Sequence, residues 1–367
     1  LKGLMQSSSR NLPRTMHFFE NSMEAVTFPY VNKVGLNSRP NGVALWFGKQ
    51  MEEVDRTLFK VPNLQPDWTY DTICKRYLDN ETFLLNEYAE RGYKTLLAED
   101  WMQGTLNWPK CWGFDKQPTD HYMRSVFTPY FWVVSGFLCQ RCGDGTLAVL
   151  GYPKIGWIWL SLLGHDHESG VIHADIDFQR FLLDNKKKVR KKRFIGMVPF
   201  LNYCVTRTKL GSLEVNNPLF SISIPKVLRE TTDALQMLKE NAARLQTHYD
   251  IRATLLDILK HQPAVNFTDR TLMEFDGEYG MSLLRSQGDV ERTCKNLPIP
   301  ITYCTCQEPK SSELTHRYSP SAGRPVQLAT MEQVRSTESV NYTAQCCRRS
   351  KNASSSICET FTAPTME

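Results

Sequence analysis

The sequence of 367 residues has no apolar run long enough to cross a membrane. Its most apolar stretch, residues 147–164, is interrupted by Pro153, Lys154 and several glycines, and falls short of the roughly 20 apolar residues that a spanning helix needs. A buried strand explains this stretch better. The chain opens LKGLMQSSSR, without the apolar core of a signal peptide. Since its first residue is not Met, this absence excludes nothing about secretion.

The chain also has little net charge, +5, and its charged residues amount to an ordinary 23%. Much of the positive excess lies in one run, KKKVRKKR at 186–193. Such a run can mimic a nuclear signal or a heparin patch, but a solvated helix end ahead of a strand explains it more simply. We therefore expect no nucleic-acid partner.

Cysteine is abundant: the chain has 11, and five of them follow residue 300. Four N-x-[ST] sequons occur, at Asn80, Asn266, Asn341 and Asn352. Together these features predict disulfides, an extracellular or secretory location and glycans at Asn80 and Asn266. Cys139 and Cys142 form a lone CxxC with no second pair at zinc-ribbon spacing, so we interpret them as disulfide candidates.

The periodicity predicts an α/β fold in which helices and strands alternate. We expect a helix over 71–91, ended by Gly92, then a buried strand in YKTLLAED. Further predicted elements are a strand in GWIWLSLL, a helix in HADIDFQRFLLDNKKK, strands in RFIGMVPFL and PLFSISIP, and an amphipathic helix over 250–260. From about residue 291 the composition shifts to Cys, Ser, Thr and Pro. This predicts one domain over 1–290 and a Cys-bearing extension over 291–367, partly disordered.

Two polar segments directly follow predicted strands, where ligand sites of doubly wound folds gather. One is NSRPNG at 37–42 and the other is GHDHE at 164–168. Each also has a purely structural interpretation. The first can be a turn that caps the next helix, and the second a polar helix cap.

Several blocks resemble, in order, an animal family named domain of unknown function 229, which is related to sulfatases. They are NKVGLNSRPNGVALWFGKQ, GYKTLLAEDW, GFDKQPTDHYMR, LGHDHESGVIHADIDFQRFL, TKLGSLEVNNPLFSISIP, THYDIRATLLDIL and the ending IPITYCTCQE with Cys304 and Cys306. The blocks cover roughly residues 10 to 308. The resemblance implies an alkaline phosphatase-like, sulfatase-like fold, with a mostly parallel sheet sandwiched by helices.

That superfamily hydrolyses sulfate or phosphate esters with a nucleophile beside divalent metals. The resemblance places Ser38 at the nucleophile position and Asn41 at an amide position facing a transferred oxyanion. It places His165 and Asp166 among the ligands of a zinc or calcium ion. His121 and Arg124 in PTDHYMR are weaker candidates for the pocket, and a structural ion pair involving this segment is the alternative.

Two family motifs are missing. Related sequences open with G-x-D-S-x-S-R, whose Asp is a metal ligand, whereas residues 3–10 read GLMQSSSR. Related sequences carry D-H-G just before the TKLGSLE block, whereas residues 194–204 contain neither Asp nor His. Either the protein is a pseudoenzyme, or both stretches are errors in the printed sequence, since matching resumes cleanly at Thr208.

The function that follows is a secreted sulfatase-like domain, a hydrolase of sulfate or phosphate esters by resemblance but inactive as printed. The alternative is an extracellular pseudoenzyme that binds a small sulfated or phosphorylated ligand or a partner. Among the remaining residues, we expect His248 to face solvent, and we expect four aromatic residues to be packing residues: Trp101, Trp108, Trp112 and Phe114.

Overall fold

The computed structural model describes residues 11–100, 104–107, 109–124, 152–161, 170–192, 195–197 and 215–305. The chain divides into two units. The smaller unit contributes residues 55–64 to the described part, a turn with a 3-10 helix at Thr57–Phe59. There the carboxylate of Asp55 accepts the backbone N–H of Thr57 at 2.9 Å. The larger unit holds all other described elements.

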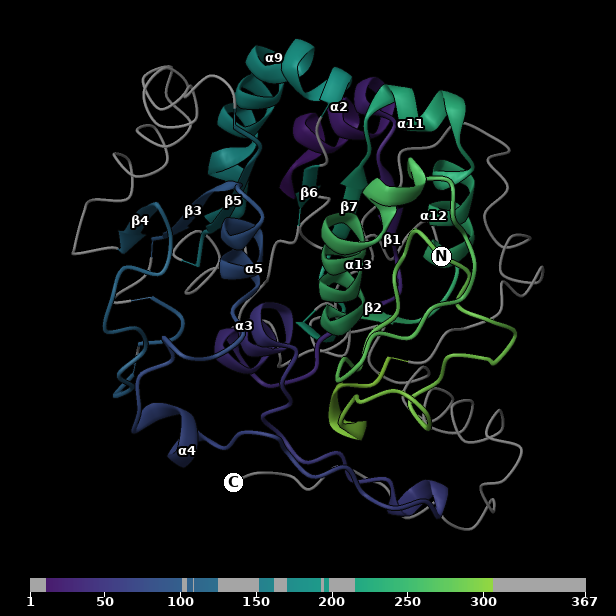
Figure 1. The fold of residues 1–367 in the computed structure, drawn as a ribbon. Helices are drawn as coiled ribbons and strands as arrows, with labels where there is room; N and C mark the ends of the chain where they lie inside the picture. Colours follow the sequence, from purple (N-terminus) through teal and green to yellow (C-terminus); the bar gives the residue numbers. More distant parts are fainter. Residues whose placement is uncertain are drawn as a thin grey trace, which may run out of the picture. The chain divides into compact units, whose positions relative to one another are not determined.

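A three-stranded parallel sheet lies in the larger unit, in the order β4-β3-β5 (Figure 1). Its strands are β3 (Lys94–Glu99), β4 (His121–Arg124) and β5 (Lys154–Trp159). Glu99 pairs with Arg124 on one side and with Trp159 on the other. Because all three strands run in the same direction, their carboxyl ends meet at one edge. The strands predicted in YKTLLAED and GWIWLSLL are confirmed.

The other strands form two smaller sheets. In one, β7 (Phe220–Ser223) pairs antiparallel with β1 (Val26–Phe28) and β6 (Ile195–Met197). In the other, β2 (Val31–Asn32) pairs parallel with β8 (Gln246–Thr247). The predicted α/β class is confirmed. Within the described residues, however, the strands form three small sheets, and one of these is antiparallel.

At the top of Figure 1, helix α2 (Pro13–Met23) packs against α9 (Asp175–Lys192), beside α11 (Lys226–Thr231). No side chain of the preceding residue caps α2. Instead, the carboxylate of Asp175 accepts the backbone N–H groups of Arg14 at 3.1 Å and Thr15 at 2.9 Å. A distant helix thus satisfies the free donors that begin α2. The predicted helix in HADIDFQRFLLDNKKK is confirmed, and residues 186–192 of the basic run are its last turns.

Three helices pack together beside the parallel sheet: α3 (Ser38–Phe47), α5 (Leu84–Glu90) and α13 (His248–Lys260). Trp46 of α3 is fully buried, with its ring centroid 5.1 Å from that of Trp159 and 6.3 Å from that of Phe83. Helix α13 was expected to be amphipathic, yet eleven of its thirteen residues are buried. The helix is therefore enclosed on nearly all sides, and the charged side chains of Asp250, Arg252 and Asp257 have partners inside the protein.

The remaining short elements are α4 (Tyr70–Cys74), α12 (Ala234–Ala242) and 3-10 turns at Gly170–Ala174, Gln262–Val265 and Ile301–Tyr303. No helix in the described part of the chain is long and apolar enough to span a membrane.

The single helix predicted over 71–91 is wrong. Helix α4 ends at Cys74, whose disulfide to Cys111 ties it to another segment, and α5 begins only at Leu84. Between them the carboxylate of Asp79 accepts the backbone N–H groups of Asp115 and Lys116 at 2.9 and 2.8 Å. These contacts with a distant segment outweigh the local helical periodicity.

The packing role predicted for four aromatic residues is confirmed for Phe114 and wrong for Trp112, and Trp101 and Trp108 lie outside the described residues. Phe114 is buried against Phe83, with ring centroids 5.1 Å apart. Trp112 is 54% exposed and lies beside Tyr77, which is also exposed, with ring centroids 5.1 Å apart. The carbonyl of Trp112 accepts from Nδ2 of the buried Asn107 at 2.7 Å, so the backbone of Trp112 faces the interior while its indole ring lies at the surface.

The domain boundary expected at residue 290 falls inside the larger unit, which continues to Thr305. Leu297 and Ile299 are buried, and a disulfide joins Cys294 to Cys304. Residues 291–305 thus belong to the larger unit, and the predicted division into a domain and an extension stays a prediction. Residues 306–367 lie outside the described part of the chain.

Candidate functional site

The candidate nucleophile Ser38 is the first residue of α3, which follows β2 after the loop 33–37. Asn37 caps the helix, because its Oδ1 accepts the backbone N–H of Arg39 at 3.2 Å. Ser38 is half-buried, and no described residue forms a hydrogen bond with its hydroxyl. The hydroxyl thus lies at a helix N-terminus, where the partial positive charge of the backbone N–H groups favours anions.

The second candidate residue of the motif, Asn41, is 2% exposed and forms hydrogen bonds with the backbone of the loop before it. Its Nδ2 donates to the carbonyl oxygens of Gly35 at 2.8 Å and Asn37 at 2.7 Å. Its Oδ1 accepts the backbone N–H of Val34 at 2.8 Å. Both amide hydrogens are therefore engaged by the backbone, and Asn41 holds the turn that presents Ser38. The oxyanion contact predicted for Asn41 stays a prediction.

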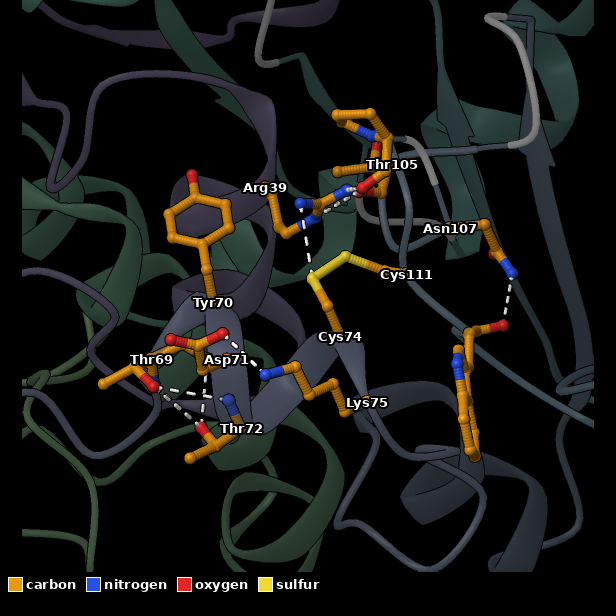
Figure 2. The surroundings of a disulfide bond; sticks show 12 residues. Arg39, Thr69, Tyr70, Asp71, Thr72, Cys74, Lys75, Thr105, Asn107 and Cys111 are labelled. Atoms are coloured by element: carbon orange, nitrogen blue, oxygen red, sulfur yellow. Dashed lines mark hydrogen bonds and ion pairs between the residues drawn. A yellow bond between two sulfur atoms is a disulfide. The ribbon is translucent and has the colours of Figure 1, made fainter.

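Arg39, the residue directly after Ser38, is a buried arginine that ties the start of α3 to a distant loop, and sequence reasoning missed it. Arg39 donates its Nε hydrogen to the carbonyl of Thr105 at 3.2 Å and its Nη2 hydrogen to that of Pro109 at 3.3 Å. Figure 2 shows its guanidinium beside the disulfide, with Nη1 3.6 Å from the sulfur of Cys74. The guanidinium also lies over the ring of Tyr70. Burial lowers the pKa of Arg39, and the nearby Tyr70 opposes this shift.

Two buried acids lie at the carboxyl end of β3, and one of them is connected to α3 through Thr105. Glu99 and Asp100, at the carboxyl end of β3, are 3% and 4% exposed. Glu99 Oε1 accepts the backbone N–H of Thr105 at 2.8 Å, and the carbonyl of Thr105 accepts from Arg39. The carboxyl edge of the sheet is thereby joined to the start of α3. The signal that indicates these acids is their position directly after a buried strand.

The predicted metal ligands His165 and Asp166 lie outside the described residues. Among the residues that are described, no group of three or more His, Cys, Asp or Glu side chains is arranged to hold a metal ion. The described residues alone therefore do not fit the zinc or calcium site that the resemblance implies, and they assign no chemical step to a metal.

A family described as "Protein of unknown function (DUF229)" matches residues 5–364. The chain belongs to this family. No curated protein matches the DUF229 chain. Two similar solved structures are of the C-terminal periplasmic domain of EcEptC from Escherichia coli, one of them in complex with Zn. The structure with Zn shares 14% identity with this chain and the other shares 13%, each at a TM-score of 0.44. Each match covers 77% of this chain, and it covers 82% of the first solved chain and 81% of the second.

In this DUF229 chain the two weaker site candidates lie at different ends of β4. Arg124 is level with Glu99 at the carboxyl end, whereas His121 pairs with Leu96, about 10 Å back along the strand. Beside His121, the carboxylate of Asp120 accepts from Lys94 Nζ at 2.6 Å. This ion pair lowers the pKa of Asp120 to about 2 and is the structural alternative considered for this segment. His121 and Arg124 stay predictions as pocket residues.

His248, expected to face solvent, is fully buried at the start of α13. Burial lowers the pKa of His248 to about 3, and a hydrogen bond with the backbone of Asn32 opposes this shift. The expectation failed because strand β8, which ends directly before His248, pairs with β2. This pairing places the side chain of His248 in the interior. The imidazole is therefore a neutral packing group in the folded protein.

The predicted glycan sites Asn80 and Asn266 are both exposed, on a turn before α5 and after a 3-10 turn. Their exposure leaves room for a glycan, and glycosylation at either position stays a prediction. Disulfides were predicted without their pairing, and the described residues contain Cys74–Cys111 and Cys294–Cys304. Cys139, Cys142 and Cys306 lie outside the described residues.

Proposed function

We propose that this chain is a sulfatase-like domain of the alkaline phosphatase superfamily that binds a sulfate or phosphate ester at the start of α3 without hydrolysing it. The observation that carries the proposal is the placement of Ser38. Its half-buried hydroxyl lies at the N-terminus of a long helix, and no described residue forms a hydrogen bond with it. A helix N-terminus attracts anionic oxygens, and a hydroxyl there can donate to one of them.

The absence of hydrolysis follows from the sequence. The superfamily lowers the pKa of its nucleophile with metals, and it needs carboxylate and imidazole ligands to hold them. Residues 3–10 contain no Asp, and residues 194–204 contain neither Asp nor His. Without these ligands Ser38 keeps an ordinary hydroxyl, which contacts an anion but does not attack it.

An extracellular location belongs to the same proposal. Two disulfides lie within the described residues, and disulfides persist mainly in oxidising compartments. The exposed sequons at Asn80 and Asn266 agree with passage through the secretory pathway. Detecting N-glycans on either residue by mass spectrometry supports this location, and a purely nuclear location contradicts it.

The test is a binding titration of the purified full-length chain with inorganic sulfate, inorganic phosphate and their p-nitrophenyl esters, with and without Zn²⁺ or Ca²⁺. We expect saturable binding with no release of p-nitrophenol above the blank. Ser38→Ala removes one neutral hydrogen bond and should weaken binding about three- to tenfold. Ser286→Ala, at another half-buried serine, is the matched control and should leave binding unchanged. Equal affinity of Ser38→Ala and wild type would place the ligand elsewhere.

Hydrolysis is the second candidate function, favoured by one observation. The family blocks resume cleanly at Thr208, directly after the altered residues, which is unlike gradual loss. Sequencing the transcript across codons 1–16 and 186–208 decides between the two. If an Asp near residue 5 and an Asp-His-Gly near residue 197 are restored, metal-dependent release of p-nitrophenol, abolished by Ser38→Ala, is the expected result. If the printed residues stand, binding without turnover is expected.

A further inference from the structure

A disulfide-closed loop near the end of the described chain packs against the strand that leads to Ser38. We call residues 294–304 the cystine loop, because Cys294 and Cys304 are joined. Ile299 inside it is fully buried. Just before it, Arg292 donates Nη2 to the carboxylate of Asp250 at 2.6 Å, and this carboxylate is itself completely buried. The cystine loop is thus anchored to α13 as well as closed on itself.

Tyr303, next to Cys304, connects the cystine loop to β2 and to the loop 33–37. Its carbonyl accepts the Nδ2 hydrogen of Asn32, and its ring lies 4.6 Å from the ammonium group of Lys33. Its hydroxyl donates to Oε2 of Glu52 at 2.8 Å. Burial raises the pKa of Tyr303, and the neighbouring Glu52 adds to this shift. The hydroxyl therefore remains a donor to Glu52 over the whole physiological pH range.

The second carboxylate oxygen of Glu52 accepts a hydrogen bond from the loop that precedes Ser38. Its Oε1 accepts the backbone N–H of Leu36 at 2.7 Å. The fit around this contact is tight, since a Cβ on Gly35 would lie 2.9 Å from Oε1 of Glu52 and 2.4 Å from Pro40. A carboxylate that accepts from two neutral donors makes stronger hydrogen bonds than a neutral acceptor does. Glu52 therefore bridges the cystine loop and the turn that presents Ser38.

We propose that Glu52 is a positioning residue for Ser38, which transmits the closure of the cystine loop to the turn before α3. The inference rests on the proposed ligand site at Ser38, and it names the group that holds this site in its binding geometry. Leu36 is 52% exposed, so its side chain adds little to hold the turn. The backbone contact with Glu52 then restrains Leu36, beside the contacts by which Asn41 holds the rest of the turn.

The inference is tested in the full chain by hydrogen exchange of the amides of residues 34–39 and by affinity for inorganic sulfate. Glu52→Ala should raise exchange at Leu36, and at Arg39, whose N–H is held by the capping Asn37, at least about tenfold and weaken sulfate binding several-fold. Glu52→Gln keeps an acceptor for Leu36 and should recover most of both properties. Tyr303→Phe removes only the hydroxyl and should give a smaller change in the same direction. Glu53→Gln, at the exposed neighbouring glutamate, is the matched control.

The outcomes separate the two proposals. Unchanged exchange at Leu36 in Glu52→Ala overturns the positioning role. Raised exchange with unchanged sulfate affinity also overturns it, because the turn then moves without affecting the site. If the wild type binds no sulfate, the proposed ligand site fails, and the exchange of the Arg39 amide, which Asn37 caps, decides the positioning role alone. Faster exchange there supports it, and retained protection contradicts it.

Discussion

Arg252 of α13 donates its Nε hydrogen to both carboxylate oxygens of Glu278, at 3.0 and 2.9 Å, and the arginine side chain is 1% exposed. Its Nη1 donates to the carbonyl of Trp46 at 2.6 Å. A Cβ on Gly48, which ends α3 with a φ of +67°, would lie 2.4 Å from the carboxylate of Glu278. This ion pair therefore holds the far end of the helix that begins at Ser38.

Removing one member of this buried pair should be strongly destabilising. Glu278→Ala leaves the charge of Arg252 buried without its carboxylate, and we expect the free energy of unfolding to fall by about 3–5 kcal/mol. The control is Asp71→Ala in the exposed pair with Lys75, where a loss below about 1 kcal/mol is expected. Urea denaturation followed by circular dichroism measures both. A loss below about 1 kcal/mol for Glu278→Ala would mean that the pair is not buried as described.

His248 should make the fold sensitive to acid. Its pKa is about 3 in the folded protein, lowered by burial, and about 6.5 in the unfolded chain. Between these values the unfolded chain binds the additional proton, so the stability of the fold decreases as the pH falls from 6.5 towards 3. Denaturation from about pH 7.5 to 4.5 should show a steeper decline for the wild type than for His248→Gln. Parallel curves for the two proteins would contradict this assignment.

Lys33 should make stability rise with pH as well, but in the alkaline range. It is 5% exposed, and burial lowers its pKa from 10.5 to about 8, with Glu52 opposing the shift. Above pH 8 the folded protein releases a proton that the unfolded chain keeps until pH 10.5, so the fold gains stability across this window. Between about pH 7.5 and 10 the gain should be about 2 kcal/mol relative to Lys33→Met, which has no such proton. Denaturation of both proteins at about pH 7.5, 9 and 10 measures it, and a constant difference would refute it.

The two disulfides should contribute unequally to stability. Cys74–Cys111 closes a sequence separation of 37, against 10 for Cys294–Cys304. By loop-closure entropy, replacing the first pair with serines should cost about 4 kcal/mol and replacing the second about 3 kcal/mol. The first replacement also removes the sulfur beside Arg39. Thermal unfolding of the two double variants gives the order of their stabilities, and a reversed order would count against the prediction.

Several elements follow from local sequence pattern. The strand at Lys94–Glu99 and the helices at Asp175–Lys192 and His248–Lys260 lie where periodicity predicts them. Long helices and strands can be recognised in the sequence because buried and exposed positions alternate with the period of the element. The predicted helix over 71–91 failed because a disulfide at Cys74 and the contacts of Asp79 with a distant turn compete with that local preference.

The sequence by itself determined the family, the α/β class and the position of Ser38 at the start of a helix, since these depend on motifs and on local periodicity. Only the tertiary structure decided that Arg39 binds Thr105 and that Glu52 binds the backbone of the turn before Ser38. It also decided that Asn41 is occupied by the backbone and that His248 is buried. The physical reason is that Thr105, Tyr303 and the β2–β8 pair reach the site from distant parts of the chain. Contacts of this kind depend on how elements pack, and no local pattern encodes them.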